Sequence, residues 1–363
     1  MTDHSIFNNK KVLFHTLGCK LNFAESSYIS KQLMNEGFVK VKPGEQADVC
    51  IINTCTVTDI ADRKSRQAIG KLHRLHPNAI IIVIGCYAQL KPEEIANLPG
   101  VNLVLGSHEK FNILEYLKGL DKNNPTSIHR TEIKHVKEFR HSSSREDRTR
   151  YFLKVQDGCD YFCTYCTIPF ARGRSRNAPV SETLAMAQSI IREGAKEIVL
   201  TGVNIGDFGK SSGESFFDLL KAIDDINADV RFRISSIEPN LLSDEIITFA
   251  AQSKRIMPHF HIPLQSGSNE VLGLMKRKYN RELFAHRVEK IKSLMPDAFI
   301  GVDAPDFNLA LEKSLKQRGI PSIHYVSPSI WAWRGQRIHK IGAAVSRVLA
   351  LFPFEPTLYE KQG

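Results

Sequence analysis

The sequence predicts an α/β protein in which a doubly wound parallel sheet is followed by an incomplete (βα) barrel. Three buried β-branched runs in the first third are separated by helical stretches, a pattern typical of a parallel sheet. A second alternating series begins at Tyr151. Repeated βα units of this length favour a full or partial barrel with its function at the carboxyl ends of the strands.

Strands of the first third are expected over 11–17, 48–53 and 79–84, and helices over 24–36 and 62–76. In the second series the strands are expected over 151–156, 197–201, 230–235, 259–264 and 298–302, and the helices over 181–192, 216–226, 243–252 and 269–294. The stretch between the two series is polar and rich in charge and serine, which is typical of a linker. We therefore predict a domain over 1–120, a linker over 121–150 and a partial barrel over 151–303.

Composition favours a polyanionic partner. The 363 residues carry a formal net charge of +10, which favours nucleic acid, although an ordinary basic surface is the alternative. No apolar run reaches the roughly 18 residues that a membrane span needs. The N-terminus lacks the apolar core of a signal peptide, so we expect a cytoplasmic protein with reduced cysteines.

Cys159, Cys163 and Cys166 form a C-x3-C-x2-C loop directly after the first strand of the second series. Three thiolates on one loop suit a [4Fe–4S] cluster whose fourth iron stays open for another ligand. A zinc knuckle that borrows a distant histidine, or three unrelated core cysteines, are the alternatives.

Cys19, Cys55 and Cys86 lie far apart in sequence, yet each follows a predicted parallel strand. In an open α/β sheet the carboxyl ends of such strands converge on one crevice, so the three thiols can form a second site. The alternative is that buried thiols merely fill the sheet. That alternative suits Cys50, which lies inside a strand.

Several runs resemble one family, the radical-SAM methylthiotransferases. They are Thr16-Leu-Gly-Cys-Lys-Leu-Asn22, Asn53-Thr-Cys-Thr-Val-Thr58, Gly85-Cys-Tyr-Ala-Gln89, the run 156–173 around the second cysteine set, Arg233-Ile-Ser-Ser-Ile-Glu-Pro239 and the run 259–267. The resemblance covers about residues 10–303. The subgroup it is most similar to modifies threonylcarbamoyladenosine at position 37 of tRNA.

The resemblance implies an enzyme that adds a methylthio group to C2 of that nucleoside by radical S-adenosylmethionine chemistry. It implies two [4Fe–4S] clusters, one on Cys19, Cys55 and Cys86 and one on the second cysteine set, which would also bind S-adenosylmethionine. It further implies an electron donor such as flavodoxin or ferredoxin, and we expect a monomer. Another adenosine, a ribosomal protein, or an inactive chain that only binds clusters are the alternatives.

Other residues are secondary candidates. Tyr165, Gly202, Asn204, Arg233 and Gln265 are expected to contact the cofactor, although a glycine turn at 202 and a structural ion pair at 233 are the alternatives. His259 and His261 would share a strand face with Gln265. Arg172, Arg174 and Arg176 are candidate tRNA contacts, with a solvated charged face as the alternative. A predicted helix adds further basic candidates, namely Arg63, Lys64, Arg66, Lys71 and Arg74.

Beyond Asp303 this resemblance stops. The runs 303–308, 324–334 and 349–355 resemble lipid-A-disaccharide synthase, and that similarity covers about residues 297–363. We therefore predict a C-terminal α/β fragment from another family over 304–363, a join near Asp303, and no RNA-binding β-domain. Most of the glycosyltransferase would be missing, so no sugar transfer is expected.

The fragment has its own βα pattern, with helices expected over 308–318 and 336–345 and strands over 322–326 and 347–352. We hypothesise that its first helix and strand take the place of the missing barrel elements. Ile323 and Tyr325 would then pair beside the strand at 298–302. Trp331 and Trp333 would be exposed unless they pack on the barrel.

Overall fold

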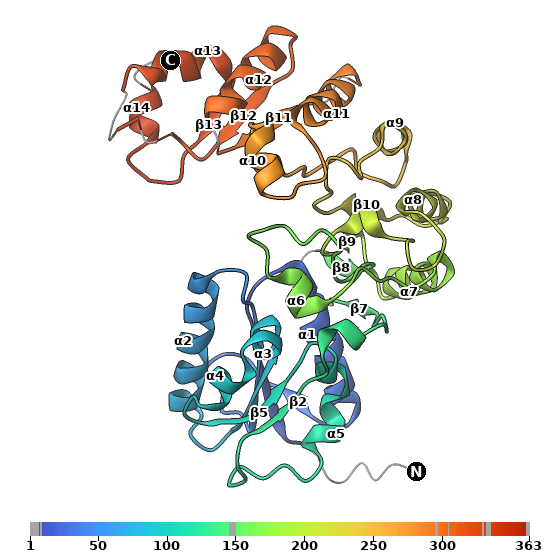
Figure 1. Cartoon of the computed structure of the whole chain (residues 1–363), viewed down its shortest axis with the longest axis vertical. Coiled ribbons are helices and arrows are strands. Elements are labelled where there is room, and N and C mark those ends of the chain that lie inside the picture. The colour runs from blue at the N-terminus through green and yellow to red at the C-terminus, as the bar shows by residue number, and fades with distance from the viewer. Residues whose placement is uncertain are drawn as a thin grey trace.

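A computed structural model describes residues 7, 9–144, 150–294, 297–303, 305–328, 330–331 and 335–360. The strands of these residues form three sheets of six, four and three strands, which follow one another along the long axis of the molecule (Figure 1). The N-terminal sheet and its helices lie at one end and the C-terminal fragment at the other. The α/β fold class is thus confirmed, and the described residues contain no closed barrel.

The N-terminal sheet has the strand order β2-β1-β3-β4-β5-β6, and all its strand pairs are parallel. Its strands are β1 (Lys11–Thr16), β2 (Val39–Lys40), β3 (Val49–Thr54), β4 (Ile80–Gly85), β5 (Val101–Leu105) and β6 (Ser127–His129). Its helices are α1 (Lys20–Asn35), α2 (Asp59–Leu75), α3 (Cys86–Leu90), α4 (Pro92–Ala96), η1 (Glu109–Asn112) and α5 (Ile113–Leu117).

Strand β4 shows why this sheet is covered on both faces. Ile81 and Val83 pack into one hydrophobic core, whereas Ile82 and Ile84 pack into the core on the opposite face. Successive side chains of a strand point to opposite faces, so an uninterrupted apolar run needs helices on both sides. Because both faces of the sheet are covered, a site can form at the edge where the strands have their carboxyl ends.

The second sheet has the order β10-β9-β8-β7. Its strands are β7 (Ser142–Ser143), β8 (Tyr151–Lys154), β9 (Glu197–Thr201) and β10 (Arg231–Ile234), and its helices include α6 (Ile168–Arg172), α7 (Val180–Arg192), α8 (Phe216–Asp224) and α9 (Asp244–Gln252). The segment predicted as a linker is tied into both sheets, because it supplies β6 to the first and the antiparallel edge strand β7 to the second. The domain boundaries themselves stay a prediction.

The strand predicted over 259–264 is wrong. This segment forms one isolated bridge, between His261 and Ser236 just after β10, and Ile256 ahead of it forms another with Phe232. Gln265 adopts a left-handed backbone with φ of 63°. A strand cannot continue through that conformation, so the expected period-2 alignment of His259, His261 and Gln265 is lost.

The single helix predicted over 269–294 is two helices, α10 (Asn269–Leu274) and α11 (Arg281–Ser293). Lys276 is left-handed, with φ of 56°, which ends the first helix. The second begins after Asn280, whose side chain accepts a hydrogen bond from the backbone N–H of Leu283.

The third sheet consists of β11 (Phe299–Val302), β12 (Ser322–Tyr325) and β13 (Arg347–Leu349), with α12 (Pro305–Gln317), α13 (Arg337–Ala344) and α14 (Pro356–Glu360) around it. The predicted pairing is confirmed, since Ile323 lies opposite Ile300 and Tyr325 opposite Val302. The idea that this pair completes the barrel is wrong. Among the described residues, β11 pairs only with β12 and joins no strand of the second sheet.

The reason is that the fragment has a core of its own. Ile341 and Ala344 of α13 pack with Ile330 and Val345, apart from the main core of the second sheet. His324 and Glu312 are both buried and bonded to each other at 2.8 Å. Trp331 is half exposed and packs edge-on against Phe354, whereas Trp333 lies outside the described residues.

Two separate cores predict two separable unfolding transitions. Both tryptophans of the chain lie in the C-terminal fragment, so tryptophan fluorescence reports on that unit alone. We expect Ile341→Ala to destabilise it by about 2–4 kcal/mol and to move the fluorescence transition to lower urea. The matched substitution Ile223→Ala, in the core of the second sheet, should move the far-UV circular dichroism transition and leave the fluorescence transition in place. Coincident shifts in both variants would contradict separate cores.

Candidate functional site

The first cysteine triad lies at the carboxyl edge of the N-terminal sheet, where the sequence places it. Cys19 precedes α1, Cys55 follows β3, and Cys86 begins α3 directly after β4. The three are near enough to act on one another, because burial first, and then the charge of Cys19, raises the pKa of both other thiols. Cys50 is fully buried inside β3, as predicted for a core residue, and burial raises its pKa to about 11.

Gly18 lets two of these strand ends approach each other closely. Its φ is +97°, and a Cβ added there would lie 2.8 Å from the Cβ of Cys55 and 3.2 Å from its Sγ. Asn22 holds the same two strand ends together, since its amide nitrogen donates to the carbonyls of Leu17 at 2.8 Å and Thr54 at 3.0 Å. Tight packing of backbone thus sets where Cys19 and Cys55 lie.

The second triad lies on the loop between β8 and α6. Cys159 donates its backbone N–H to the carbonyl of Gly173 at 3.0 Å, and that of Cys166 donates to the carbonyl of Cys163 at 3.0 Å. Burial raises the pKa of the Cys159 thiol to about 12, and the charges of Cys166 and Cys163 add to the effect. The three thiols therefore lie close enough on this loop for their charges to act on Cys159.

Gln156 is the central brace of this loop. It is fully buried, donates to the carbonyls of Asp157 and Gly158, and accepts from the backbone N–H of Asn204 at 2.9 Å. A Cβ at Gly202 would lie 2.8 Å from its amide oxygen, so the glycine predicted as a cofactor contact makes room for Gln156. The close approach of Gln156 thus explains why a glycine stands at 202, a reason that neither the predicted cofactor contact nor the alternative of a glycine turn anticipated.

The two cysteine loops meet. Thr167, next to Cys166, donates its hydroxyl to the carbonyl of Thr56, next to Cys55, at 3.2 Å. Figure 1 shows α6 lying directly over the helices of the N-terminal sheet. The geometry therefore brings together two sets of thiols that the sequence could only place on separate strands and loops.

Behind this contact lies a group of charged side chains that we call the buried ion network. It contains two carboxylates and four cations, each no more than about one-tenth exposed: Glu25, Asp157, Lys110, Lys154, Arg172 and Arg176. Glu25 is the hub, because Lys110, Lys154 and Arg172 all pair with it, at 2.6 to 3.0 Å.

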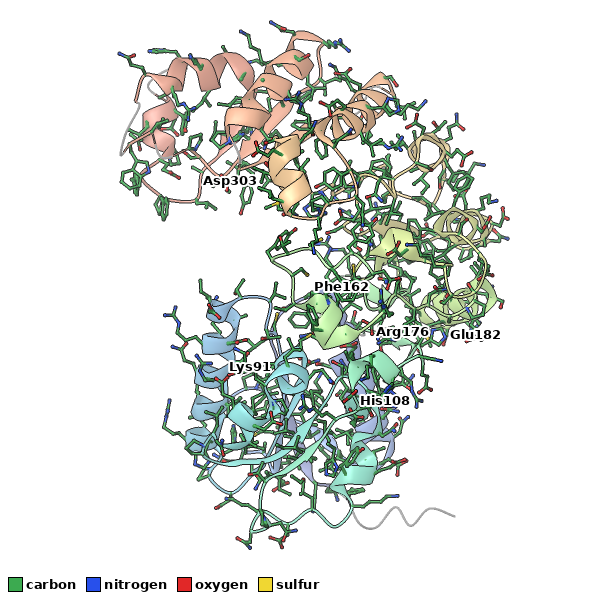
Figure 2. The ribbon with its side chains drawn as sticks, viewed as in Figure 1. Lys91, His108, Phe162, Arg176, Glu182 and Asp303 are labelled. Carbon is green, nitrogen blue, oxygen red and sulfur yellow. The ribbon has the colours of Figure 1, made fainter. Side chains whose placement is uncertain are left out.

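The network corrects part of the predicted RNA surface. Arg172 and Arg176 do not face solvent but pair with buried carboxylates, so they are not phosphate contacts (Figure 2 labels Arg176 at this junction). Buried guanidinium groups need such partners, and the run of arginines in the sequence carries no sign of them. Arg174 alone is exposed, where it lies over the ring of Phe162 at 4.8 Å.

The remaining predicted cofactor contacts are Tyr165, Asn204, Arg233 and Gln265. Tyr165 is about half exposed and accepts a hydrogen bond from Arg277, while Asn204 is buried beside Asp207. Arg233 forms an ion pair with Glu197 at 3.1 Å, which favours the structural alternative. Gln265 is exposed on the irregular segment described above.

Sequence reasoning missed several polar residues around the second triad. Arg277 donates to the Sγ of Cys163 at 3.1 Å and also pairs with Glu238. Asp207 is fully buried, and burial raises its pKa. Asn240 donates to the hydroxyl of Tyr161 at 2.6 Å. Of these residues and their partners, only Glu238 lies in a run that resembles the family, the run 233–239.

Lys20, next to Cys19, faces a group of cationic side chains of the second half. Burial first, then Arg150 and Arg233, lowers its pKa. Burial likewise lowers the pKa of His261, and the charge of Lys20 adds to the effect. His259 shows the same direction of pKa shift, from burial first and then Arg233. Positive charge thus gathers between the two halves, near Cys19.

The donor chemistry of the triads fits iron–sulfur clusters. In the part of the chain that the structure describes, no three His, Cys, Asp or Glu side chains stand as a preformed ion site. Each triad nevertheless offers three sulfurs, the ligands of such clusters. Cations lie near the first triad. Burial raises the pKa of the Cys86 thiol, whereas the charges of Arg172 and Lys110 lower it. They favour the thiolate, which is the ligating form.

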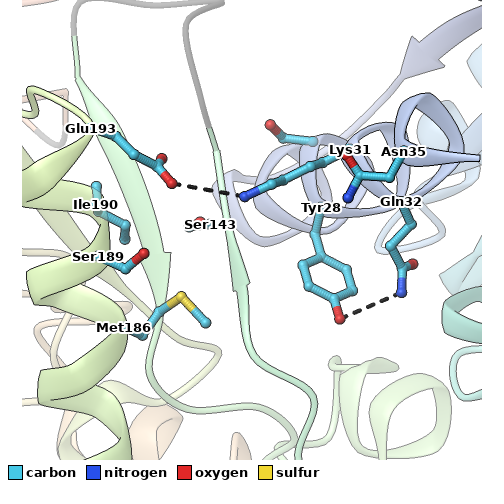
Figure 3. A pocket seen from close by; sticks show the side chains of 10 residues that line it. Tyr28, Lys31, Gln32, Asn35, Ser143, Met186, Ser189, Ile190 and Glu193 are labelled. Carbon is cyan, nitrogen blue, oxygen red and sulfur yellow. Dashed lines mark hydrogen bonds and ion pairs between the residues drawn. The ribbon is translucent and has the colours of Figure 1, made fainter.

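A separate cavity of about 280 Å³ lies between α1 and α7 (Figure 3). Lys31 and Glu193 approach each other across it at 3.8 Å, and Tyr28, Gln32 and Met186 are among its lining residues. Its lining includes none of the six cysteines. The thiols, not this cavity, are therefore the candidate site.

Family comparisons divide the chain as the sequence does. Uncharacterized protein family UPF0004 matches residues 11–106, the radical SAM superfamily matches 153–305, and lipid-A-disaccharide synthetase matches 265–363. The predicted second resemblance is thus confirmed, and the predicted join lies inside the overlap of the last two matches. No helix among the described residues combines the length and apolar character that a membrane crossing requires.

Among known structures, the radical S-adenosylmethionine methyltransferase TsrM from Kitasatospora setae is similar with a TM-score of 0.55 and 14% identity, over 97% of this chain and 76% of that one. This likeness supports the fold. The loop of the second triad, between β8 and α6, lies within the residues that match the radical SAM superfamily.

Curated relatives identify the family. Threonylcarbamoyladenosine tRNA methylthiotransferase MtaB is 41% identical in Bacillus subtilis, over 80% of this chain and 66% of the relative. The proteins of the same name are 41% identical in Thermotoga maritima and 37% identical in Aquifex aeolicus, over 67% and 72% of the relatives. The chain belongs to this methylthiotransferase family. It spans about two thirds of the length of these relatives.

The close approach at Gly18 generates a test. We expect Gly18→Ala to strain the backbone, push Cys55 away and reduce iron bound after anaerobic reconstitution by at least half. Gly44→Ala is the matched control, because Gly44 also has a positive φ, +101°, but open space around its Cβ position. Equal iron loss in both variants would show that backbone strain alone, rather than the approach to Cys55, is responsible.

Proposed function

We propose that this chain adds a methylthio group to C2 of N6-threonylcarbamoyladenosine at position 37 of tRNA. The observation that carries the proposal is that the strand end bearing Cys55 of the first triad meets the loop of the second triad at the Thr56–Thr167 hydrogen bond. One site that generates a radical and another that supplies sulfur must lie near each other for such a reaction. The relatives named for this activity, at 37–41% identity, support the same conclusion.

Cys159, Cys163 and Cys166 would hold the cluster that binds S-adenosylmethionine, and the first triad would hold the second cluster. When bound, these groups supply the reductive cleavage, the radical and the sulfur that breaking and replacing an aromatic C–H bond requires. The contribution of the chain is to orient the reactants and exclude water. The six cysteines as ligands belong to this proposal.

Residues around the second triad have roles that follow from their contacts. Arg277 donates hydrogen bonds to the Sγ of Cys163 and to the hydroxyl of Tyr165, and so would orient both side chains. Asp207 is already paired with Lys210 and with the amide nitrogen of Asn204. The buried side-chain oxygen of Asn204 has no hydrogen-bond partner among the described residues, and this acceptor is suited to the ammonium group of a methionine moiety. Lys20 and the cations around it would attract the phosphates of the RNA toward the first triad.

A second RNA surface is proposed on α2. Arg63, Lys64, Lys71 and Arg74 are exposed on this helix. Arg66 differs from them, because it is held by Glu94 at 2.8 Å and by the hydroxyl of Tyr87 at 2.9 Å. Four exposed cations on one helix suit the regularly spaced phosphates of an RNA backbone.

The finer expectations about partners belong to the same proposal. A low-potential donor such as flavodoxin or ferredoxin would reduce the clusters, and the protein would act as a cytoplasmic monomer. A second candidate substrate is a different modified adenosine. It is favoured by the 34% identity to tRNA-2-methylthio-N(6)-dimethylallyladenosine synthase of Clostridium botulinum. A ribosomal protein substrate, or a chain that binds clusters without turnover, is the remaining alternative.

Cysteine variants test the proposal. With reductant, S-adenosylmethionine and tRNA, we expect the parent to form 5′-deoxyadenosine and a methylthio nucleoside identified by mass. Cys159→Ala should abolish both products, whereas Cys19→Ala should keep 5′-deoxyadenosine and lose the nucleoside. Cys50→Ala is the control, because it removes a buried thiol outside both triads. A parent that cleaves no S-adenosylmethionine would identify the inactive, cluster-binding alternative.

The α2 surface is tested by charge removal. We expect the double substitution Lys64→Gln and Lys71→Gln to weaken tRNA binding. The slope of log affinity against log salt should fall by about 1 for each phosphate that the helix no longer neutralises. Lys254→Gln, an exposed lysine of the second half, is the control. An unchanged salt slope in the double variant would exclude α2 from the interface.

A further inference from the structure

Arg172 joins the elements that carry both cysteine triads. It lies six residues after Cys166, and its guanidinium donates to both carboxylate oxygens of Glu25, at 2.9 and 3.1 Å. Glu25 lies six residues after Cys19, in α1. The same guanidinium donates to Asp157, two residues before Cys159, at 3.0 Å. One side chain therefore contacts both halves of the candidate site.

Its remaining contact is to Asn22. The guanidinium donates to the side-chain oxygen of Asn22 at 2.7 Å. That bond fixes the orientation of the amide, whose nitrogen donates to the carbonyls of Leu17 and Thr54. These carbonyls belong to the strand ends that lead into Cys19 and Cys55. Arg172 thus reaches the first triad through a single intervening side chain.

The charges of the buried ion network are unequal. Four cations face two carboxylates, which leaves a surplus of two positive charges among side chains that are at most about one-tenth exposed. Unbalanced buried charge is costly unless a further charge offsets it. Cys86 lies close to this network, since it begins α3, and α3 packs against α6, the helix that ends at Arg172. A [4Fe–4S] cluster held by three thiolates would carry a net negative charge, which would offset part of this surplus.

We propose that Arg172 is a positioning residue for the first cysteine triad, although it belongs to the loop of the second. It holds Asn22, and through it the ends of β1 and β3, in the arrangement that a cluster needs, and it contributes charge that balances the cluster. This inference rests on the proposed function only in assigning a cluster to the first triad.

A purely structural role would be shared with other contacts between the halves. Ser107 donates to the carbonyl of Ala171 at 2.7 Å, and Lys154 also pairs with both Glu25 and Asp157. These contacts remain when Arg172 is replaced. The bond to Asn22 does not, so the effect of the substitution should concentrate on the first triad.

The experiment uses the full chain with Cys159, Cys163 and Cys166 replaced by alanine, so that all bound iron reports on the first triad. Iron per chain is measured after anaerobic reconstitution, and the reduction potential of the cluster is followed by electron paramagnetic resonance. In this background we expect Arg172→Gln to lose at least half of the iron. The cluster that remains should be harder to reduce, because a nearby positive charge is gone.

Two substitutions separate charge from geometry. Arg172→Lys keeps the charge but lacks the fork that reaches Glu25 and Asn22 together, so we expect a potential near that of the parent with partial iron loss. Arg176→Gln is the matched control. It removes one positive charge from the same network, where Arg176 pairs with Asp157 at 3.2 Å, but it leaves the Arg172–Asn22 bond intact. It should retain most of the iron.

Far-UV circular dichroism and gel filtration of the iron-free proteins identify any variant that fails to fold. Glu25→Gln then carries the test, because it keeps the shape of the side chain and removes the carboxylate charge that anchors Arg172. Iron content and potential equal to the parent in the folded Arg172→Gln variant, or losses equal to those of Arg176→Gln, would overturn this inference alone. A parent background without any iron would overturn the assignment of the first triad as well.

Discussion

The ion pair between Arg172 and Glu25 is the interaction on which the arrangement of this molecule depends. Two hydrogen bonds join the groups in a site without solvent, and removing one partner of such a pair typically costs about 3–5 kcal/mol. The pair connects a helix of the N-terminal sheet with the short helix that follows the second cysteine loop. Because both cysteine loops lead directly into these helices, the pair fixes them against each other.

Strand geometry explains the rest of the site. Parallel strands end at one edge, so Cys19, Cys55 and Cys86 meet there although 67 residues separate the first from the last. Gly18 permits the close approach, and Asn22 closes it with hydrogen bonds. The second triad needs no such convergence because one loop carries it, but Gln156 must hold that loop in place. Three strand ends therefore carry the first set of three thiols, and a single loop carries the second.

The C-terminal fragment obeys the same α/β rules without joining the site. Its helix α12 packs against β11 and β12 of a small parallel sheet and against α13, and its buried Glu312–His324 pair lies in its own interior. Interchangeable βα units explain why the predicted pairing of β11 with β12 is present. A separate core explains why this pair does not extend the second sheet. Similarity to lipid-A-disaccharide synthetase over residues 265–363 agrees with that independence.

The sequence by itself determined the α/β class, the long helices and buried strands, and the two sets of cysteines, because periodicity and strand-end position are local properties. It did not reveal short elements such as β2, β7, α3 and α6, which carry too few residues to show a period. It did not determine which arginines are buried, since Arg172, Arg174 and Arg176 alternate in one run and differ only in what lies opposite them. It did not reveal Arg277, Asp207 or Gln156, whose partners are distant in sequence. Those contacts exist only once two sheets pack together, and tertiary structure alone decided that the cysteine loops share a buried network of charges.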